Sequence, residues 1–300
     1  MKIGPIVRLA PNYVSIADPD ALNAVYGHGT GAPKSDFYDA FVSIRPGLFT
    51  TRDRNDHTRK RKMVSNVFSP KNVLEFEPHL ARHVLRLTER WDRLYDLALR
   101  GMSGDDGEGG WEGKNGRLYL DVVPCKLQVQ PLSVVVHTTH VLGVVYLAFD
   151  IIGDLAFGAP FGMLEVAKDI AIVPKHHGNH KAVMDSYGKQ EVGSELIGVP
   201  AAQILAGRGE YSMCMGVLPP YCRPFVSQLP GYRFGKECVK DLAGISIMAV
   251  AKRLANPSNR ADLLNKLQSG RDAEGKPMGR EELTAEAQTF LIAGSDTTSK

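Results

Sequence analysis

The sequence predicts a mainly helical protein with a small β-sheet near its amino-terminal end. Several long segments repeat apolar residues every three or four positions, which is the period of an α-helix. The clearest strand pattern, two β-branched runs around a turn, lies within residues 6–16. The 300 residues are 43% hydrophobic and 23% charged. That composition excludes disordered chains, collagens and small disulfide scaffolds.

The amino-terminal elements follow from turn and capping residues. Residues 6–10 and 13–16 are predicted strands of a hairpin, with Pro11 and Asn12 as the turn. Asp18 suits the N-cap of a short helix, and Pro19 suits its first position.

Two helices are predicted next. The first is strongly basic and covers residues 54–68, and the second starts at Ser69-Pro70. The predicted buried stripe of the second helix consists of Val73, Leu74, Leu80, Val84, Leu87, Trp91, Leu94 and Tyr95.

The middle of the chain holds two unusual stretches. Residues 101–117 are rich in Gly, Asp and Glu, which predicts a flexible, solvated acidic loop. Residues 124–145 form an atypical valine-rich insert without a clear period. Polar residues at its centre disfavour a membrane span, so a buried strand is the preferred interpretation. A gene-model error, such as a retained intron, is a hypothesis for this insert that sequencing of the spliced transcript tests.

Helical patterns return in the second half. They cover residues 146–158, 234–256 and 260–268, and a last helix begins at Arg280. One face of that last helix carries Leu283, Ala287, Phe290 and Leu291. The amino-terminal sequence holds no signal or anchor pattern, and no helix terminator precedes Lys300, so the chain is expected to be cut at both ends.

Charge and metal-binding residue types exclude several functions. The net charge of +3 is too small to argue for nucleic acid or an anionic membrane. The cysteines occur singly, which favours neither disulfides nor structural zinc and fits a reducing compartment. The histidines of residues 176–180 lie in a polar stretch without nearby acids, so a solvated loop is favoured and no metal site is assigned.

The last helix carries the most informative motif, residues 293–298, Ala-Gly-Ser-Asp-Thr-Thr. The small residues Ala293 and Gly294 leave room for a flat group against the helix. Asp296 next to Thr297 can hold water and pass protons. Glycine and threonine are poor helix formers, as is common at functional sites. The alternative is that Asp-Thr-Thr opens a new helix or turn.

With these residues the chain resembles the amino-terminal half of a fungal cytochrome P-450, a haem-thiolate monooxygenase. The resemblance implies the cytochrome P-450 fold, truncated after the central oxygen-activating helix, with residues 1–300 as a partial domain. It implies haem as cofactor, Thr297 as the group that hydrogen-bonds iron-bound dioxygen, and Asp296 as part of a proton relay. Ala293 and Gly294 would face the cofactor.

A second motif of that family is an aromatic residue followed four positions later by arginine, which holds a haem propionate. It is matched by His57 and Arg61, with histidine in place of the usual tryptophan. A fixed, always charged guanidinium suits a carboxylate. The alternative for Arg59 to Lys62 is a solvated face, a nuclear-localisation run or a nucleic-acid module.

The family's iron ligand has no counterpart here. The Phe-x-x-Gly-x-Arg-x-Cys-x-Gly loop is absent from the sequence, as is the Glu-x-x-Arg pair. Cys238 lies in a helical pattern with the wrong spacing, which predicts an ordinary buried thiol. The resemblance therefore implies that this chain alone binds haem poorly and is inactive.

Residues 149–158 and other phrases are similar to the benzoate 4-monooxygenase branch of the family. That similarity implies para-hydroxylation of a small aromatic acid such as benzoate by the intact protein, with NADPH electrons delivered through a reductase. It implies the endoplasmic reticulum membrane for the intact family and, without an anchor, the cytoplasm for this chain. The alternative is an inactive truncated or pseudogene product. No nucleic-acid partner is expected.

Overall fold

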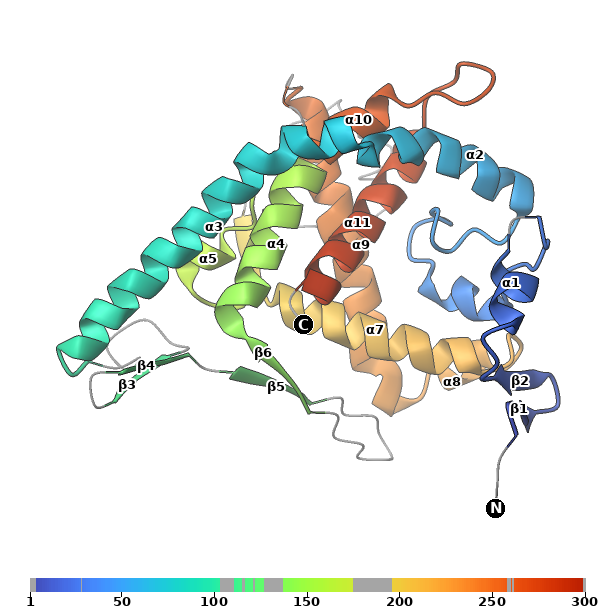
Figure 1. Cartoon of the computed structure of the whole chain (residues 1–300), viewed down its shortest axis with the longest axis horizontal. Coiled ribbons are helices and arrows are strands. Elements are labelled where there is room, and N and C mark those ends of the chain that lie inside the picture. Colours follow the sequence, from blue (N-terminus) through green and yellow to red (C-terminus); the bar gives the residue numbers. More distant parts are fainter. Residues whose placement is uncertain are drawn as a thin grey trace.

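The computed structural model is mainly helical with small two-stranded sheets, which confirms the predicted fold class (Figure 1). It describes residues 4–27, 29–102, 111–114, 117–120, 122–126, 137–174, 196–257, 260 and 262–298. No helix among these residues has both the length and the apolar character that a membrane crossing requires.

The predicted amino-terminal hairpin is confirmed. Strands β1 (Ile6–Ala10) and β2 (Tyr13–Ile16) pair antiparallel. Helix α1 (Ala21–Tyr26) begins later than expected, because Asp18 accepts a hydrogen bond from the backbone N–H of Asp20 and closes a turn instead of capping a helix. The 3₁₀ helix η1 (Asp36–Phe41) follows.

The two predicted helices form at the expected positions. Helix α2 (Arg54–Ser65) is capped by the side chain of Asp53 and continues into η2 (Asn66–Phe68). Helix α3 (Pro70–Leu99) begins at the proline, whose missing N–H costs nothing in a first turn.

The predicted buried stripe of α3 is largely wrong. Val73, Leu74, Leu80, Val84 and Tyr95 are exposed, and the buried residues are Asn72, Phe76, His83, Leu87, Arg90, Leu94 and Ala98. Polar partners explain the difference. His83 lies 3.2 Å from a carboxylate oxygen of Asp154, and the amide oxygen of Asn72 accepts a hydrogen bond from Lys266.

The acidic stretch is not a loop throughout. Strand β3 (Trp111–Lys114) lies inside the predicted loop 101–117, and it pairs antiparallel with β4 (Arg117–Leu120), which begins at the last residue of that loop. The strands form because the segment contains aromatic residues, which favour strands, and apolar leucines: Trp111, Leu118, Tyr119 and Leu120. Residues 103–110 lie outside the described residues.

The valine-rich insert is described only at its two ends. Strand β5 (Val122–Lys126) pairs antiparallel with β6 (His137–Val141). Helix α4 (Leu142–Phe157) then begins before the expected residue 146. Residues 127–136 lie outside the described residues, so the gene-model hypothesis for 124–145 stays a prediction.

The long helix α7 was not predicted. It covers Ala201–Val217 and follows three short elements that were not predicted either: α5 (Met163–Val166), β7 (Ala171–Pro174) and β8 (Leu196–Val199). Gly207 lowers the helix propensity of this segment, so the sequence pattern does not indicate a helix. A Cβ there would lie 2.7 Å from Phe234 of α9, so glycine allows the two helices to approach closely. The histidines of 176–180 lie outside the described residues.

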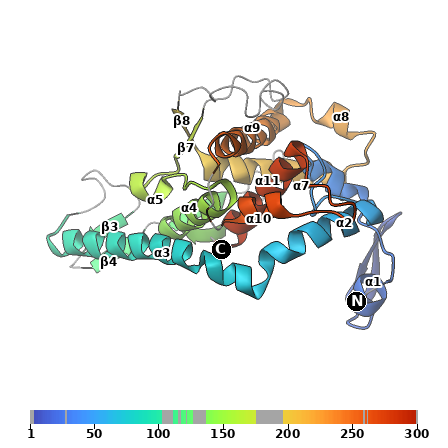
Figure 2. The same cartoon turned by 90° about the horizontal axis from the view of Figure 1, so that it is seen from above.

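Two short helices that were not predicted follow, α8 (Arg223–Val226) and η4 (Pro230–Tyr232). The last three helices agree with the predictions: α9 (Arg233–Ala255), α10 (Leu263–Ser269) and α11 (Arg280–Thr298). Helices α9 and α11 lie at the centre of the view in Figure 1, with α3 and α4 to one side and α7 crossing below them. Figure 2 shows the same helices from above.

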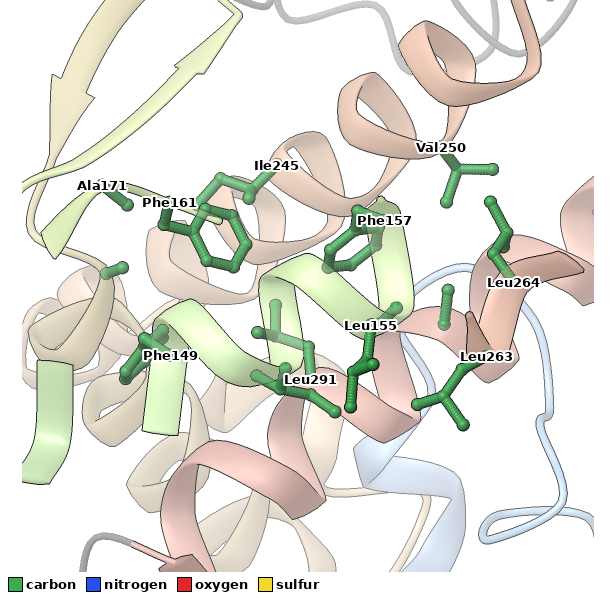
Figure 3. Close-up of a cluster of buried hydrophobic side chains, with 14 of the residues drawn as sticks. Phe149, Leu155, Phe157, Phe161, Ala171, Ile245, Val250, Leu263, Leu264 and Leu291 are labelled. Carbon is green, nitrogen blue, oxygen red and sulfur yellow. The ribbon is translucent and has the colours of Figure 1, made fainter. Parts of the chain in front are cut away.

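The core forms around α4. Phe149, Leu155 and Phe157 of this helix meet side chains of α9, α10 and α11, including Ile245, Leu263 and Leu291 (Figure 3). A helix that is apolar on most of its surface needs such neighbours on several sides. This packing holds α11, which carries the sequence motif, in the centre of the protein.

Candidate functional site

A cavity of about 300 Å³ lies where three segments meet: the stretch from Phe41 to Thr50, helix α7 and helix α11. Its volume is at the lower end of the range for small-molecule sites. Most of the lining surface is apolar, although eight of the lining residues have polar side chains. The apolar residues include Phe41, Phe49, Ala285, Ile292 and Ala293, and the polar ones are Ser43, Arg45, Thr50, Arg208, Gln288, Thr289, Asp296 and Thr297.

Buried polar contacts hold the first of these segments in place. Lys60 of α2 is fully buried and donates hydrogen bonds to the carbonyl of Pro46 and the hydroxyl of Thr51. From the other side, Glu286 of α11 accepts a hydrogen bond of 2.7 Å from the N–H of Leu48. The cavity wall is therefore tied to both α2 and α11.

The basic run of α2 is thus not only a solvated face. Arg59 forms an ion pair with Glu282 of α11, and Lys60 pairs with Asp56 at 2.8 Å. Arg61 and Lys62 are exposed. Two of the four basic residues, Arg59 and Lys60, are thus engaged in ion pairs within the protein. This disfavours the nucleic-acid alternative, which needs basic side chains that are free to bind phosphates.

The motif of α11 brings three predicted site residues together. Ala293, Asp296 and Thr297 line the cavity and lie on the exposed side of the helix. The Thr297 hydroxyl donates a 2.7 Å hydrogen bond to the carbonyl of Ala293, one turn earlier. Its proton is held by its own helix, and its oxygen remains able to accept a hydrogen bond.

Gly294 lies on a different side of α11. A Cβ at this position would lie 2.9 Å from Ile152 of α4. Helix packing therefore accounts for its small size, and its predicted contact with a cofactor stays a prediction.

His57 and Arg61 share a face of α2, one turn apart, and neither lines the cavity. Burial lowers the pKa of the half-buried His57, and the positive charges of Lys34, Arg61 and Lys60 lower the same pKa further. The surroundings of His57 are therefore positively charged and favour an anion.

Arg208 of α7 is the site residue that sequence reasoning missed. Only 5% of it is exposed, and it lines the cavity. Its sequence context offers little signal, because Gly207 and Gly209 on either side lower the helix propensity of this segment. A buried arginine becomes conspicuous only when its surroundings are known.

The described cysteines lie away from the cavity. Cys214, Cys222 and Cys238 are free thiols, and none of them lines it. Cys238 is buried between α7 and α9, where burial raises the pKa of its thiol to about 11. This confirms the expectation of an ordinary buried thiol.

Comparison with known proteins shows what the chain is similar to. No family model matches it. It is 44% identical to benzoate 4-monooxygenase bphA of Aspergillus niger, over 99% of this chain and 50% of that protein. It is 27% identical to trichothecene C-15 hydroxylase of Fusarium sporotrichioides, over 99% of this chain and 48% of the relative.

A third relative matches over a shorter stretch. This is cytochrome P450 monooxygenase asR2 of Sarocladium schorii, at 31% identity over 56% of this chain and 27% of the relative. The chain thus spans about half the length of the two curated relatives that match it almost throughout.

Proposed function

We infer that this chain belongs to the cytochrome P450 monooxygenase family, and we propose that it forms part of an aromatic-acid hydroxylase. In that enzyme the chain would supply the substrate cavity and helix α11, which carries the motif at residues 293–298. The observation that carries this proposal is the shared cavity. Ala293, Asp296 and Thr297 line it together with the aromatic side chains of Phe41 and Phe49. A small aromatic molecule bound there would therefore lie beside the acid and hydroxyl of α11.

The described residues fit haem in part. Family membership implies haem, and the cation-rich surroundings of His57 and Arg61 suit its propionates. The small side chain of Ala293 leaves the exposed side of α11 open to a flat ring. No described cysteine lines the cavity, so the described part of the chain offers no thiolate ligand there. When bound, haem supplies the oxidation chemistry.

The chain's own residues would control protons and water at the cavity. Because the Thr297 hydroxyl already donates to Ala293, its oxygen can act only as an acceptor toward a bound molecule. Asp296 adds a carboxylate to the same wall. We propose that the Thr297 oxygen accepts a hydrogen bond from a water molecule at the cavity, and that the Asp296 carboxylate takes up and returns protons through this water.

Substrate and partners are part of the same proposal. The relative with the highest identity given above is named a benzoate 4-monooxygenase, and the lining of the cavity is mostly apolar with aromatic rings. We therefore propose a small aromatic acid, hydroxylated at the para position, as the substrate of the intact enzyme. NADPH and a reductase would supply its electrons. Its location at the endoplasmic reticulum stays a prediction.

A haemin titration of the 300-residue chain tests the proposal. We expect weak but saturable binding, detected by the Soret absorbance. Arg61→Gln should weaken it severalfold, because a charge-assisted hydrogen bond to a propionate is lost. Lys62→Gln is the matched control, since Lys62 is exposed on the same helix and should leave the affinity unchanged. Non-saturable binding, or equal effects of the two variants, would contradict the proposal.

The second candidate function is that this chain by itself catalyses no oxidation. The placement of Cys214, Cys222 and Cys238 away from the cavity favours this candidate. The spectrum of the reduced, carbon monoxide-treated haemin complex separates the two. A Soret band of thiolate type would show that a cysteine of this chain reaches the iron and would exclude the second candidate.

A further inference from the structure

Arg208 occupies a position that packing alone does not explain. It is 95% removed from solvent, and burial lowers the pKa of its guanidinium to about 10, so it remains a cation at neutral pH. A buried cation normally has a carboxylate beside it. In the part of the chain that the structure describes, Arg208 has no ion-pair partner.

Its hydrogen-bonding capacity is only partly used. One terminal nitrogen, Nη2, donates to the carbonyl of Phe41 at 2.7 Å, and the guanidinium lies 5.4 Å from the centre of the Phe41 ring. The Nε–H is buried and has no hydrogen-bond partner among the described residues. Leaving such a donor unpaired is costly, so it is expected to serve a ligand.

Two further polar groups of the same cavity are also unpaired. Within the described part of the chain, the hydroxyl of Ser43 and the amide nitrogen of Gln288 are buried without a hydrogen-bond partner. Ser43 comes from the segment after η1, Gln288 from α11 and Arg208 from α7. Three separate segments thus contribute residues with unsatisfied polar groups to the lining of one small cavity, and a ligand with oxygen acceptors that entered it would satisfy them.

The remaining lining residues suit an apolar part of the same ligand. Phe41, Phe49 and Ile292 offer apolar contacts, and Ala293 leaves space beside the helix motif. Asp296 lines the same cavity, and its negative charge disfavours a carboxylate at that end. A molecule with a carboxylate at one end and an aromatic ring at the other matches both parts of the cavity.

We propose that Arg208 binds the carboxylate of the aromatic acid, assisted by Ser43 and Gln288, and thereby determines substrate specificity. The inference rests on the proposed function for the substrate class and adds the residue that recognises the acid. A guanidinium can hold a carboxylate through two parallel hydrogen bonds, which orients the ring as well as attracting the charge.

Calorimetric titration of the chain with benzoate and benzamide tests this without haem. The two molecules share a ring and differ in charge. We expect benzoate to bind about tenfold or more tightly than benzamide, and Arg208→Gln to reduce this ratio to about one. Arg208→Lys should keep part of the preference, since it retains the charge but not the two-pronged geometry.

Arg223 provides the matched control. Its guanidinium donates to the backbone carbonyls of Leu218 and Gly216, and it does not line the cavity. Arg223→Gln should leave the benzoate-to-benzamide ratio unchanged. Circular dichroism and thermal unfolding establish that each variant is folded. If Arg208→Gln does not fold, Ser43→Ala takes its place and should lower the benzoate affinity severalfold.

Three results would overturn the proposal: no preference of the wild-type chain for benzoate, a full preference in folded Arg208→Gln, or loss of the preference in folded Arg223→Gln. The haemin titration is independent of all three. Failure of haem binding with an intact benzoate preference would reject the proposed function and leave the assignment of Arg208 standing.

Discussion

The Cα of Gly294 faces the side chain of Ile152 so closely that a Cβ at position 294 would lie 2.9 Å from the Cδ1 atom of Ile152. Helices α11 and α4 therefore depend on a glycine at this point. The same glycine belongs to the motif that indicates oxygen chemistry. Its role in the packing of α11 against the core can be measured separately from any role toward a cofactor.

We expect Gly294→Ala to destabilise the chain by about 1 to 3 kcal/mol, because the added methyl group overpacks the contact with Ile152. Gly209→Ala in α7 is the control. A Cβ there meets no atom within 4 Å, so alanine should raise stability by up to about 1 kcal/mol through its helix propensity. Urea unfolding measures both, and a Gly294→Ala variant as stable as the wild type would refute the close contact.

Asp154 is the second test, because it joins three elements. It is almost fully buried, lies 2.6 Å from Arg260, and contacts His83 at 3.2 Å and His79 at 3.4 Å. Burial alone would raise the pKa of Asp154, but hydrogen bonds from His83 and Arg260 outweigh it and hold the pKa well below its ordinary value.

Asp154→Asn should cost about 3 to 5 kcal/mol at neutral pH, because the guanidinium of Arg260 loses the buried carboxylate that pairs with it. A carboxyl with a lowered folded-state pKa stabilises fully above its unfolded pKa, near 4, and loses this contribution as the pH falls further. The difference in Tm between wild type and variant should therefore shrink below about pH 4. Asp39→Asn, which removes an exposed pair with Arg52, should change stability by less than about 1 kcal/mol.

Glu286 should show the opposite pH dependence. It is fully buried, and burial raises the pKa of its carboxyl to about 7, although the hydrogen bond from Leu48 N–H opposes the rise. A raised folded-state pKa gives stability that is complete below the unfolded pKa and is lost as the pH rises toward 7.

Glu286→Gln keeps an acceptor for Leu48 and removes the buried charge. It should stabilise the chain by on the order of 3 kcal/mol at pH 8 and change it little near pH 4. Thermal unfolding across this range measures the effect. The exposed Glu281→Gln on the same helix is the control and should show no such pH dependence. A variant less stable than wild type at pH 8 would contradict the burial of a charged carboxylate.

Stability should also distinguish two buried arginines. Arg253 pairs with Asp262 at 3.1 Å, whereas Arg208 has no carboxylate partner among the described residues. Arg253→Met should cost up to about 3 to 5 kcal/mol, because it removes the nearer of the two cations beside the buried Asp262 and leaves Arg260 at 3.8 Å. Arg208→Met should change the free energy of unfolding by less than about 1 kcal/mol, because it removes an uncompensated buried charge along with one hydrogen bond. A large loss in Arg208→Met would assign this residue to the packing of the fold.

Local patterns predicted much of the architecture. The apolar period identified α9 and α11, and Ser69-Pro70 marked the start of α3. These signals depend on residues near one another in the chain. Helix α7 was missed because Gly207, which packing against Phe234 requires, lowers helix propensity in the sequence.

The site divides in the same way. The motif placed Ala293, Asp296 and Thr297 on one helix, and the structure places all three at one cavity. It does not bring His57, Arg61 or Gly294 to that cavity. For these residues, the sequence pattern shows which side-chain types a helix carries. It does not show which neighbouring element each side chain faces.

By itself the sequence determined which segments become helices and which residues carry acid, hydroxyl and basic groups, because backbone preferences and apolar periods act over a few residues. Only the tertiary structure decided that Asn72 and His83 are buried in α3, and that Arg208, Ser43 and Gln288 share one cavity. The reason is that the free energy of burying a polar group depends on partners from distant elements, and packing sets the distances to them.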